Sequence, residues 1–237
     1  MRRSFQIAID GPVAAGKGTV SRLLAQKLGF LYVDTGAMYR ATALLAIRAN
    51  LKFSDEDRVV TLLEKARLEM RNPKPPKETD GRLTTVILDG EDVSWAIRTQ
   101  KCSEGASKVA VLPKLRRVLV SKQQEIAAKQ NVVMEGRDIT FRVLPEAQIK
   151  IFLTASVESR AERRHTQYLT KGTNVSLEEV IEEIKERDER DMKRDADPLH
   201  IANDAWMLDT SNLNIEEVVD LIEVKVKKMQ AKQKNKE

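Results

Sequence analysis

A glycine-rich segment near the start of the chain has the residue types and spacing that bind phosphate. Two glycines bracket four residues, and the segment reads Gly11, Pro12, Val13, Ala14, Ala15, Gly16, Lys17, Gly18 and Thr19. Glycines permit a tight loop whose backbone N–H groups point at phosphate oxygens, and the helix that follows adds the positive end of its dipole. This is the pattern of a phosphate-binding loop. We therefore expect Lys17 to contact the β- and γ-phosphates of a nucleoside triphosphate.

The hydroxyl side chain of this loop is displaced by one position. Many such loops carry Ser or Thr directly after the lysine, where the hydroxyl contacts Mg²⁺. Here the next residue is Gly18, and Thr19 follows it. Thr19 is thus the candidate for contact with a Mg²⁺ ion that accompanies the nucleotide.

Arginines form the second group with chemical potential. Arg40 follows a predicted strand, and Arg137 lies in Glu-Gly-Arg-Asp at the end of another. Two predicted helices carry more charge at spacings of three and four, which places each set on one helical face. These residues are Arg160, Arg163 and Arg164 on the first helix, and Arg187, Asp191 and Arg194 on the second. Because a guanidinium group bonds two phosphate oxygens at once, we expect these arginines to hold a second, phosphorylated substrate.

The hydrophobic pattern predicts the elements that position these groups. Apolar runs predict strands at 5–9, 31–33, 131–134, 149–153 and 205–208. Helical spacing predicts helices at 19–28, 36–49, 59–70, 107–128, 176–194 and 215–229, with further helices after the strands at 131–134 and 149–153. The alternation predicts an α/β fold with a parallel sheet flanked by helices.

Local signals refine this assignment. Ser176 and Glu179 form a capping-box pattern, and Pro113 marks a break or a first helical turn. Three prolines in 72–81 exclude both a helix and a central strand there. Residues 83–88 are β-branched and precede Asp89-Gly90, a hairpin signal. We expect a small antiparallel unit inserted into the α/β chain.

Composition limits the remaining possibilities. The chain has 237 residues, 41% of them hydrophobic and 32% charged, so most of it should fold. No apolar run approaches the roughly 20 residues of a membrane helix, and the start of the chain lacks a signal-peptide pattern. One cysteine, Cys102, excludes an internal disulfide and fits a reducing compartment. These features favour a cytoplasmic protein with no membrane partner.

Five stretches together resemble bacterial cytidylate kinases over nearly the full chain. They are 9–19, 34–40, 90–93 with 97–100, 136–138 and 184–191. The resemblance implies an enzyme that transfers the terminal phosphoryl group of ATP, with Mg²⁺, to CMP and also to dCMP. It further implies a phosphate-loop core at 1–52, 98–155 and 196–237, a CMP-binding insertion at 53–97 that contains the small antiparallel sheet, and a helical lid at 156–195.

The resemblance also assigns residue roles. ATP binding falls to the nine residues of the loop, and charge on the transferred group is stabilised by Lys17, Arg160, Arg163 and Arg164. CMP binding is assigned to Ser107, Arg116 and Asp138 at the cytosine, Arg187 and Asp191 at the ribose, Arg40, Arg137 and Arg194 at the phosphate, and Thr35 and Tyr39 in the same set. Cytosine offers an amino donor to a carboxylate, whereas uracil presents an acceptor, so Asp138 favours cytosine. A phosphate acceptor is already anionic, so no general base is required, and neither His165 nor His200 is expected to be catalytic.

Some alternatives stay open. Residues 139–142 read Ile-Thr-Phe-Arg where the family usually has a second glycine and small residues, which leaves the choice among CMP, dCMP and UMP less constrained. AMP or shikimate is a further possible acceptor. A nucleotide-dependent switch or a nucleic-acid-binding ATPase is the rival class, encouraged by the lysines near the C-terminus: Lys225, Lys227, Lys228, Lys232 and Lys234. The chain has no Asn-Lys-x-Asp motif, which a guanine-binding switch would carry, and it is only 4% aromatic, so we expect no nucleic-acid partner. We also expect a monomer.

Overall fold

A computed structural model describes residues 4–170 and 172–234, with side chains described up to residue 232. Its larger sheet contains β1 (Gln6–Asp10), β2 (Leu31–Asp34), β6 (Val132–Gly136), β7 (Ile149–Thr154) and β8 (Trp206–Asp209). The strand order is β2-β6-β1-β7-β8. The registers run parallel, with Ile9 opposite Ile151 and Leu153 opposite Leu208. The predicted α/β class and all five strands are confirmed.

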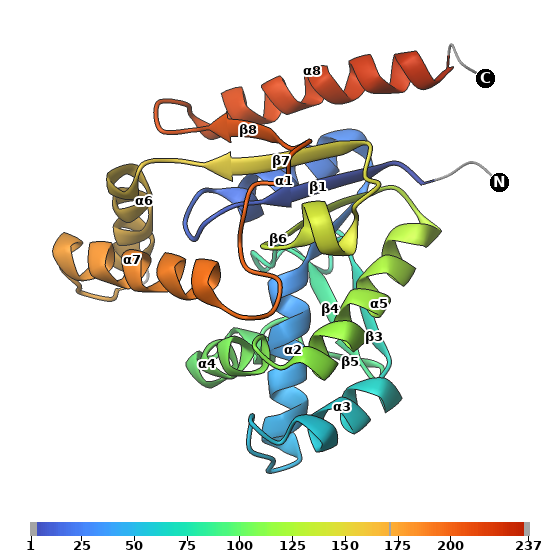
Figure 1. The fold of residues 1–237 in the computed structure, drawn as a ribbon, viewed down its shortest axis with the longest axis vertical. Coiled ribbons are helices and arrows are strands. Elements are labelled where there is room, and N and C mark those ends of the chain that lie inside the picture. Colours follow the sequence, from blue (N-terminus) through green and yellow to red (C-terminus); the bar gives the residue numbers. More distant parts are fainter. Residues whose placement is uncertain (1–3, 171, 235–237) are drawn as a thin grey trace. The chain divides into compact units, whose positions relative to one another are not determined.

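The chain forms two compact units. The described part of the first unit is 4–5 and 30–134, and the second unit comprises Gln6–Gly29 and the described residues from Glu135 onward. Figure 1 labels the strands and helices along the chain. Within the described ranges, every helix is too short or too polar to cross a bilayer.

The first unit packs helices around a small antiparallel sheet. Its helices are α2 (Thr35–Arg48), α3 (Glu56–Lys65), α4 (Gln100–Val109) and α5 (Pro113–Lys129), with a 3₁₀ turn at Ala96–Arg98. The strands β3 (Leu68–Arg71), β4 (Thr85–Leu88) and β5 (Glu91–Asp92) pair antiparallel in that order. The hairpin at Asp89-Gly90 is confirmed, since both residues have positive φ, at 51° and 87°. The expected helix at 59–70 is wrong beyond Lys65, because Met70 pairs with Val86 in the sheet.

Pro113 stands at the first turn of α5, so the predicted break divides α4 from α5. Helix α4 begins at Gln100, seven residues before the expected start at 107, because the Thr99 side chain caps it by accepting a hydrogen bond from Cys102 N. The Cys102 side chain is itself buried, with Sγ 3.6 Å from the Ala96 carbonyl oxygen.

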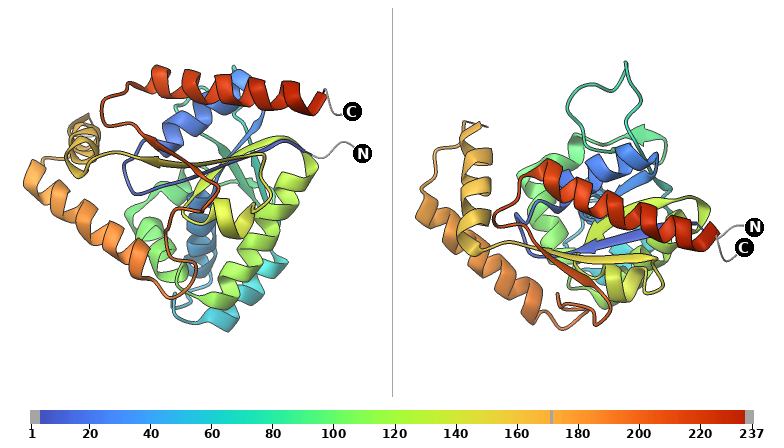
Figure 2. Two further views of the ribbon diagram at one scale, coloured as in Figure 1. Left: turned by 45° about the horizontal axis from the view of Figure 1, so that its top comes forward. Right: turned by 90° about the horizontal axis from the view of Figure 1, so that it is seen from above.

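The second unit contains the phosphate-binding loop and four helices. They are α1 (Lys17–Leu28), α6 (Val157–Thr170), α7 (Leu177–Lys193) and α8 (Ile215–Lys234). Figure 1 shows that α6 follows β7 and that α7 lies across α6, and Figure 2 shows the red helix α8 alongside α1 in both views. The capping box of Ser176 and Glu179 is confirmed. The residues after 234 at the lysine-rich end lie outside the described part of the chain.

The link from β6 to β7 differs from the expectation. A helix was expected after residues 131–134, but the chain makes only a π-helical turn at Ile139–Val143 before β7. The reason is a long-range hydrogen-bond anchor on Asp10, described below.

Candidate active site

The phosphate-binding loop requires glycine for a steric reason. At Gly11, where φ is 150°, a Cβ would lie 2.0 Å from the carbonyl oxygen of Leu153 in β7. Ala14 and Gly16 also have positive φ, at 58° and 86°, and Gly16 is the N-cap of α1. Left-handed positions of this kind turn successive backbone N–H groups toward a common concave anion site. The predicted loop thus has the backbone shape that its sequence implies.

Lys17 is the buried cation of this loop. It is 6% exposed, and its Nζ donates a hydrogen bond to the Pro12 carbonyl oxygen at 2.7 Å. Burial and, to a smaller extent, the nearby positive charge of Arg137 lower the pKa of Lys17 to about 7, although nearby carboxylates oppose both effects. A phosphate placed beside the Lys17 ammonium would supply the negative charge that this environment lacks.

A buried ion pair holds the loop from the side of α6 and α7. Arg160 Nη1 donates to Asp188 Oδ2 at 2.5 Å and to the Val13 carbonyl oxygen at 3.1 Å. Val13 N donates in turn to Asp188 Oδ1 at 3.3 Å, and Arg160 Nε donates to the Ala155 carbonyl oxygen at 3.0 Å. We call these contacts among Arg160, Asp188 and Val13 the loop clamp. In the clamp, side chains from two helices bind both the backbone N–H and the backbone carbonyl oxygen of Val13.

Five predicted CMP-binding residues of the second unit interact with one another. Arg137 Nε donates to Asp191 Oδ2 at 2.7 Å, and Arg194 Nη2 lies 4.0 Å from Asp138 Oδ1. Burial lowers the pKa of Arg187, and the charge of Arg137 adds to the effect. Burial raises the pKa of Asp191, but the charges of Arg137, Arg187 and Arg194 outweigh it and hold that pKa below its usual value. We call Arg137, Arg187 and Arg194, with the carboxylates Asp138 and Asp191, the arginine cluster.

The π-helical turn after Asp138 is anchored on a buried carboxylate. Asp10 Oδ1 accepts a hydrogen bond from Ile139 N at 2.9 Å, and Oδ2 accepts from the N and the Oγ1 of Thr140, both at 2.7 Å. Burial raises the pKa of Asp10, and the Thr140 and Ile139 hydrogen bonds partly offset this rise. Thr140, one of the unusual residues of this stretch, therefore supplies an extra hydroxyl donor that fixes the backbone next to Asp138.

The same turn contacts the segment that follows α7. Phe141 stacks on His200 with ring centroids 3.9 Å apart, and Arg142 Nε lies 3.6 Å from Asp197 Oδ1. Arg194 Nε donates to the Asp197 carbonyl oxygen at 2.9 Å. These contacts position Arg194 relative to the turn that carries Asp138.

In the first unit, the Asp34 carboxylate pairs with two arginines, Arg40 and Arg98. Asp34 caps α2 by accepting a hydrogen bond from Ala37 N at 2.9 Å, and its Oδ2 lies 2.7 Å from Arg40 Nη2 and 3.4 Å from Arg98 Nη2. Burial raises the pKa of Asp34, but the positive charges of Arg40 and Arg98 outweigh it, so the pKa lies below its usual value.

The other residues of the first unit that were predicted to bind CMP differ in burial and in their contacts. The Arg116 guanidinium lies 6.0 Å from the Tyr39 ring centroid, in cation–π geometry, and is buried. Thr35 is buried in the first turn of α2. Ser107 is exposed on α4, where its hydroxyl donates to the Ser103 carbonyl oxygen at 3.5 Å. Within this unit, Tyr39 and Arg116 come together, and Ser107 is bonded only along its own helix among the contacts described.

Comparison with known proteins decides the family. The family profile described as cytidylate kinase matches residues 7–228. This chain belongs to the cytidylate kinase family. The cytidylate kinase of Caldanaerobacter subterraneus is 48% identical over 95% of this chain and 96% of its own length, and that of Carboxydothermus hydrogenoformans is 49% identical over 91% and 94%. A solved structure of an uncharacterized protein from Eubacterium ventriosum shares the fold, with a TM-score of 0.50 at 13% identity over 97% of this chain and 99% of that chain.

The three arginines of α6 that were predicted to be catalytic have different partners in this cytidylate kinase family member. Arg160 belongs to the loop clamp, whereas Arg163 donates to the hydroxyl and the carbonyl oxygen of Thr210, at 3.1 and 2.6 Å. Arg164 Nη2 donates to the Tyr168 hydroxyl at 2.9 Å, and its charge acts on Arg187. Arg164 is therefore the lid arginine whose charge reaches the arginine cluster.

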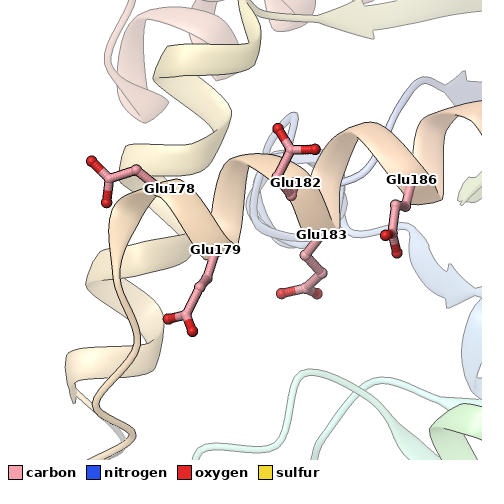
Figure 3. Close-up of a pocket in the computed structure, with 5 residues that line it drawn as sticks. All are labelled: Glu178, Glu179, Glu182, Glu183 and Glu186. Atoms are coloured by element: carbon pink, nitrogen blue, oxygen red, sulfur yellow. The ribbon is translucent and has the colours of Figure 1, made fainter.

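A hollow on α7 has the wrong charge for a phosphate site. Figure 3 shows its lining, which consists of Glu178, Glu179, Glu182, Glu183 and Glu186. Carboxylates at this density repel nucleotide phosphates. The hollow is distinct in charge from the cationic environment that a cytidylate kinase needs for its substrates.

A kinase that uses ATP requires a divalent metal ion. The described residues include no group of three or more His, Cys, Asp or Glu side chains that could ligate a metal. Asp10 is occupied by three hydrogen bonds from the π-helical turn. Thr19, half-buried in the first turn of α1, remains as an oxygen donor next to the loop. This donor set fits a cation that enters with nucleotide phosphates and keeps several of its waters, rather than a metal held in a protein cage.

Three residues that contact the predicted site residues were not singled out from the sequence. Asp10, Asp188 and Arg98 all lie in stretches that carried the family resemblance, but no role was assigned to them. Each acts through a partner far along the chain, such as Thr140 for Asp10 and Arg160 for Asp188. One available signal was that Asp10 directly follows the apolar run of the first strand, where a buried carboxylate without a partner would be costly.

Proposed function

We propose that this protein transfers the γ-phosphoryl group of ATP to CMP, and also to dCMP, giving ADP and CDP or dCDP. Membership of the cytidylate kinase family supports this activity. The observation that carries it is the arginine cluster, in which Arg137, Arg187 and Arg194 act on Asp191 and the charge of Arg137 also acts on the buried Lys17 of the phosphate-binding loop. A donor loop and an acceptor-phosphate cluster that share one electrostatic environment suit direct transfer between two phosphates.

The proposed ATP site is the loop 11–19. Its backbone N–H groups would bind the phosphates, and Lys17 would neutralise the β- and γ-oxygens. Lys17 and Arg164, together with Arg160 and Arg163 if the lid arginines exchange their present partners, would stabilise the charge of the transferred group. Lid closure over 156–195 would exclude water and limit hydrolysis of ATP.

The proposed CMP site is the set of residues that the family resemblance assigns to the acceptor nucleotide. Arg40, Arg137 and Arg194 would bind the acceptor phosphate, and Arg187 and Asp191 the ribose. The cytosine would be read by Ser107, Arg116 and Asp138, with Thr35 and Tyr39 completing the set. A carboxylate at position 138 accepts a hydrogen bond from the cytosine amino group and meets an acceptor oxygen in uracil, so CMP is favoured over UMP.

The chemistry needs positioning and charge rather than a base. The acceptor oxygen of a nucleoside monophosphate is anionic near neutral pH, so it attacks in line without prior proton removal. His165 and His200 fit this account, because their ring nitrogens lie near the carbonyl oxygens of Val175 and Pro198. Mg²⁺ bound with the nucleotide would neutralise phosphate charge during transfer, and Thr19 is the residue that would contact it.

The domain division follows the same proposal. Residues 53–97 would form the CMP-binding insertion, 156–195 the lid, and 1–52, 98–155 and 196–237 the core. We also propose that the enzyme acts as a monomer in the cytoplasm. The buried single thiol of Cys102 is compatible with a reducing compartment. Light scattering after size-exclusion chromatography would test the oligomeric state.

An acceptor panel tests the proposed function. ADP release is measured with saturating ATP and Mg²⁺ and with CMP, dCMP, UMP, AMP, GMP or shikimate in turn. We expect the highest kcat/KM with CMP, a substantial rate with dCMP, and at least about a hundredfold lower kcat/KM with UMP, because a mismatched polar group would be left unpaired. Equal rates with UMP would contradict the cytosine assignment, and exclusive use of AMP or shikimate would contradict the proposed acceptor.

A further inference from the structure

The Asp34 carboxylate is shared unequally by two arginines of the first unit. Its Oδ2 lies 2.7 Å from Arg40 Nη2 and 3.4 Å from Arg98 Nη2. The Asp34 side chain is 12% exposed, compared with 19% for Arg40 and 32% for Arg98. A carboxylate buried to this degree is costly without a cationic partner.

Arg40 combines this ion pair with an unused donor. Its Nε is buried, and no described residue accepts a hydrogen bond from it. The Asp34–Arg40 pair also requires glycine at position 36, since a Cβ there would lie 3.1 Å from Asp34 Oδ1 and 3.3 Å from Arg40 Nη1. A buried guanidinium with an open donor is suited to an anionic ligand, and a phosphate would compete with Asp34 for it.

Arg98 is held by its backbone at the place where it can replace Arg40. It ends the 3₁₀ turn Ala96–Arg98, where Arg98 N donates to the Trp95 carbonyl oxygen at 2.9 Å and Ile97 is fully buried. The next residue, Thr99, caps α4. Because both sides of Arg98 are fixed, its side chain stays within reach of Asp34 whatever Arg40 does.

We propose that Arg98 is a positioning residue for the acceptor phosphate, acting through Asp34. When Arg40 turns its guanidinium to the phosphate, Arg98 keeps the Asp34 carboxylate neutralised, so the exchange leaves no unpaired buried charge. This inference rests on the proposed role of Arg40 in CMP binding and adds a residue that does not itself touch the substrate. Loss of Arg98 leaves Asp34 with Arg40 as its single counter-ion, which weakens CMP binding.

The test is a double-mutant cycle of Arg98→Gln and Asp34→Asn. Asn is as good an N-cap as Asp, so Asp34→Asn retains the α2 cap and removes the charge. We expect Arg98→Gln to raise KM for CMP, and the Kd for CMP measured by calorimetry without ATP, by roughly tenfold, with KM for ATP unchanged. In the Asp34→Asn background the same substitution should change KM for CMP by less than about twofold, because the buried charge that Arg98 serves is gone. Arg98→Lys should restore most of the affinity.

The matched control is Arg48→Gln. Arg48 lies on the same helix as Arg40 and pairs with Glu91. Both side chains of this pair are largely exposed, so no effect of the substitution on KM for CMP is expected. Unchanged KM for CMP in Arg98→Gln, or the same factor in both backgrounds, would overturn the inference. A wild-type protein that rejects CMP in the acceptor panel would instead overturn the proposed function, so the two failures are distinguishable. Thermal unfolding of each variant separates a folding defect from a binding defect.

Discussion

The Asp188 carboxylate and the Arg160 guanidinium meet at 2.5 Å, and each also hydrogen-bonds the backbone of Val13. This pair connects α6 and α7 to the phosphate-binding loop through the backbone of one residue. The position of Val13 in the loop is therefore set by side chains that come from the proposed lid.

We expect Asp188→Asn to destabilise the protein and to weaken ATP binding. The substitution leaves a buried guanidinium without its counter-ion, which costs about 3–5 kcal/mol when one partner of such a pair is removed. Chemical unfolding and KM for ATP measure the two effects. The neighbouring Glu189→Gln is the control, because Glu189 pairs with Lys193 on the exposed face of α7. Equal stability of the two variants would argue against the loop clamp.

Lys17→Met should abolish most catalysis and leave the fold intact. Removing a preorganised charge from a transferring group typically lowers kcat by about 10²–10³. The rate of ADP formation at saturating CMP measures this loss. Lys27→Met in the same helix is the control, since Lys27 makes an exposed pair with Asp220. Full activity of Lys17→Met would exclude the loop as the site of transfer.

ATP binding should take up a proton at alkaline pH. Burial and Arg137 lower the pKa of Lys17 to about 7 in the ligand-free protein, so at pH 8 this amine is largely neutral. A bound triphosphate raises that pKa, and the amine then binds a proton, whereas at pH 6 it is already charged. Calorimetry in buffers of different ionisation enthalpy measures the uptake. We expect it to grow from pH 6 to pH 8 in the wild type and to be missing in Lys17→Met.

Arg187→Ala should lower kcat/KM for CMP by about a hundredfold, because it removes a partly desolvated cation from the arginine cluster. Arg190→Ala is the control on the same helix, since Arg190 is exposed. Initial rates over a range of CMP concentrations give both values. A similar loss in the two variants would indicate a general effect of α7 rather than a role in the cluster.

Thr140→Ala should destabilise the protein in a pH-dependent way. Burial raises the pKa of Asp10, so the native state holds its proton more tightly than the unfolded chain does, and stability falls as the pH rises above 3.8. The Thr140 hydroxyl opposes this fall by binding the charged form. We expect the variant to lose about 1–3 kcal/mol at pH 7 and less near pH 4, as measured by urea unfolding. Thr166→Ala, on the exposed side of α6, should be close to neutral at both pH values.

Turns and helix caps that depend on residues close together in the sequence were predicted correctly. The Asp89-Gly90 hairpin and the capping box at Ser176 depend on residues within four positions of each other, and both are confirmed. The helix expected to continue to residue 70 failed because the pairing of Met70 with Val86, across a long loop, outweighs a helical pattern of apolar residues.

In the candidate site, as in the fold, the local features were predictable from the sequence and the long-range contacts were not. The types and spacing of the loop glycines and of the arginines predict phosphate binding. The partners that fix them are remote: Asp10 binds Thr140 across 130 positions, and Arg98 reaches Asp34 across 64. Such pairs exist only once the chain has folded, so neither spacing nor propensity reveals them.

Because the Cys102 thiol is buried, the protein is suited to site-specific labelling at an introduced cysteine. A maleimide should react slowly with a sulfur that is 1% exposed, and a single cysteine introduced at an exposed site of α7, such as Glu182, would then react selectively. A spin label or fluorophore placed there would report whether α6 and α7 move when nucleotides bind, without first removing the native thiol.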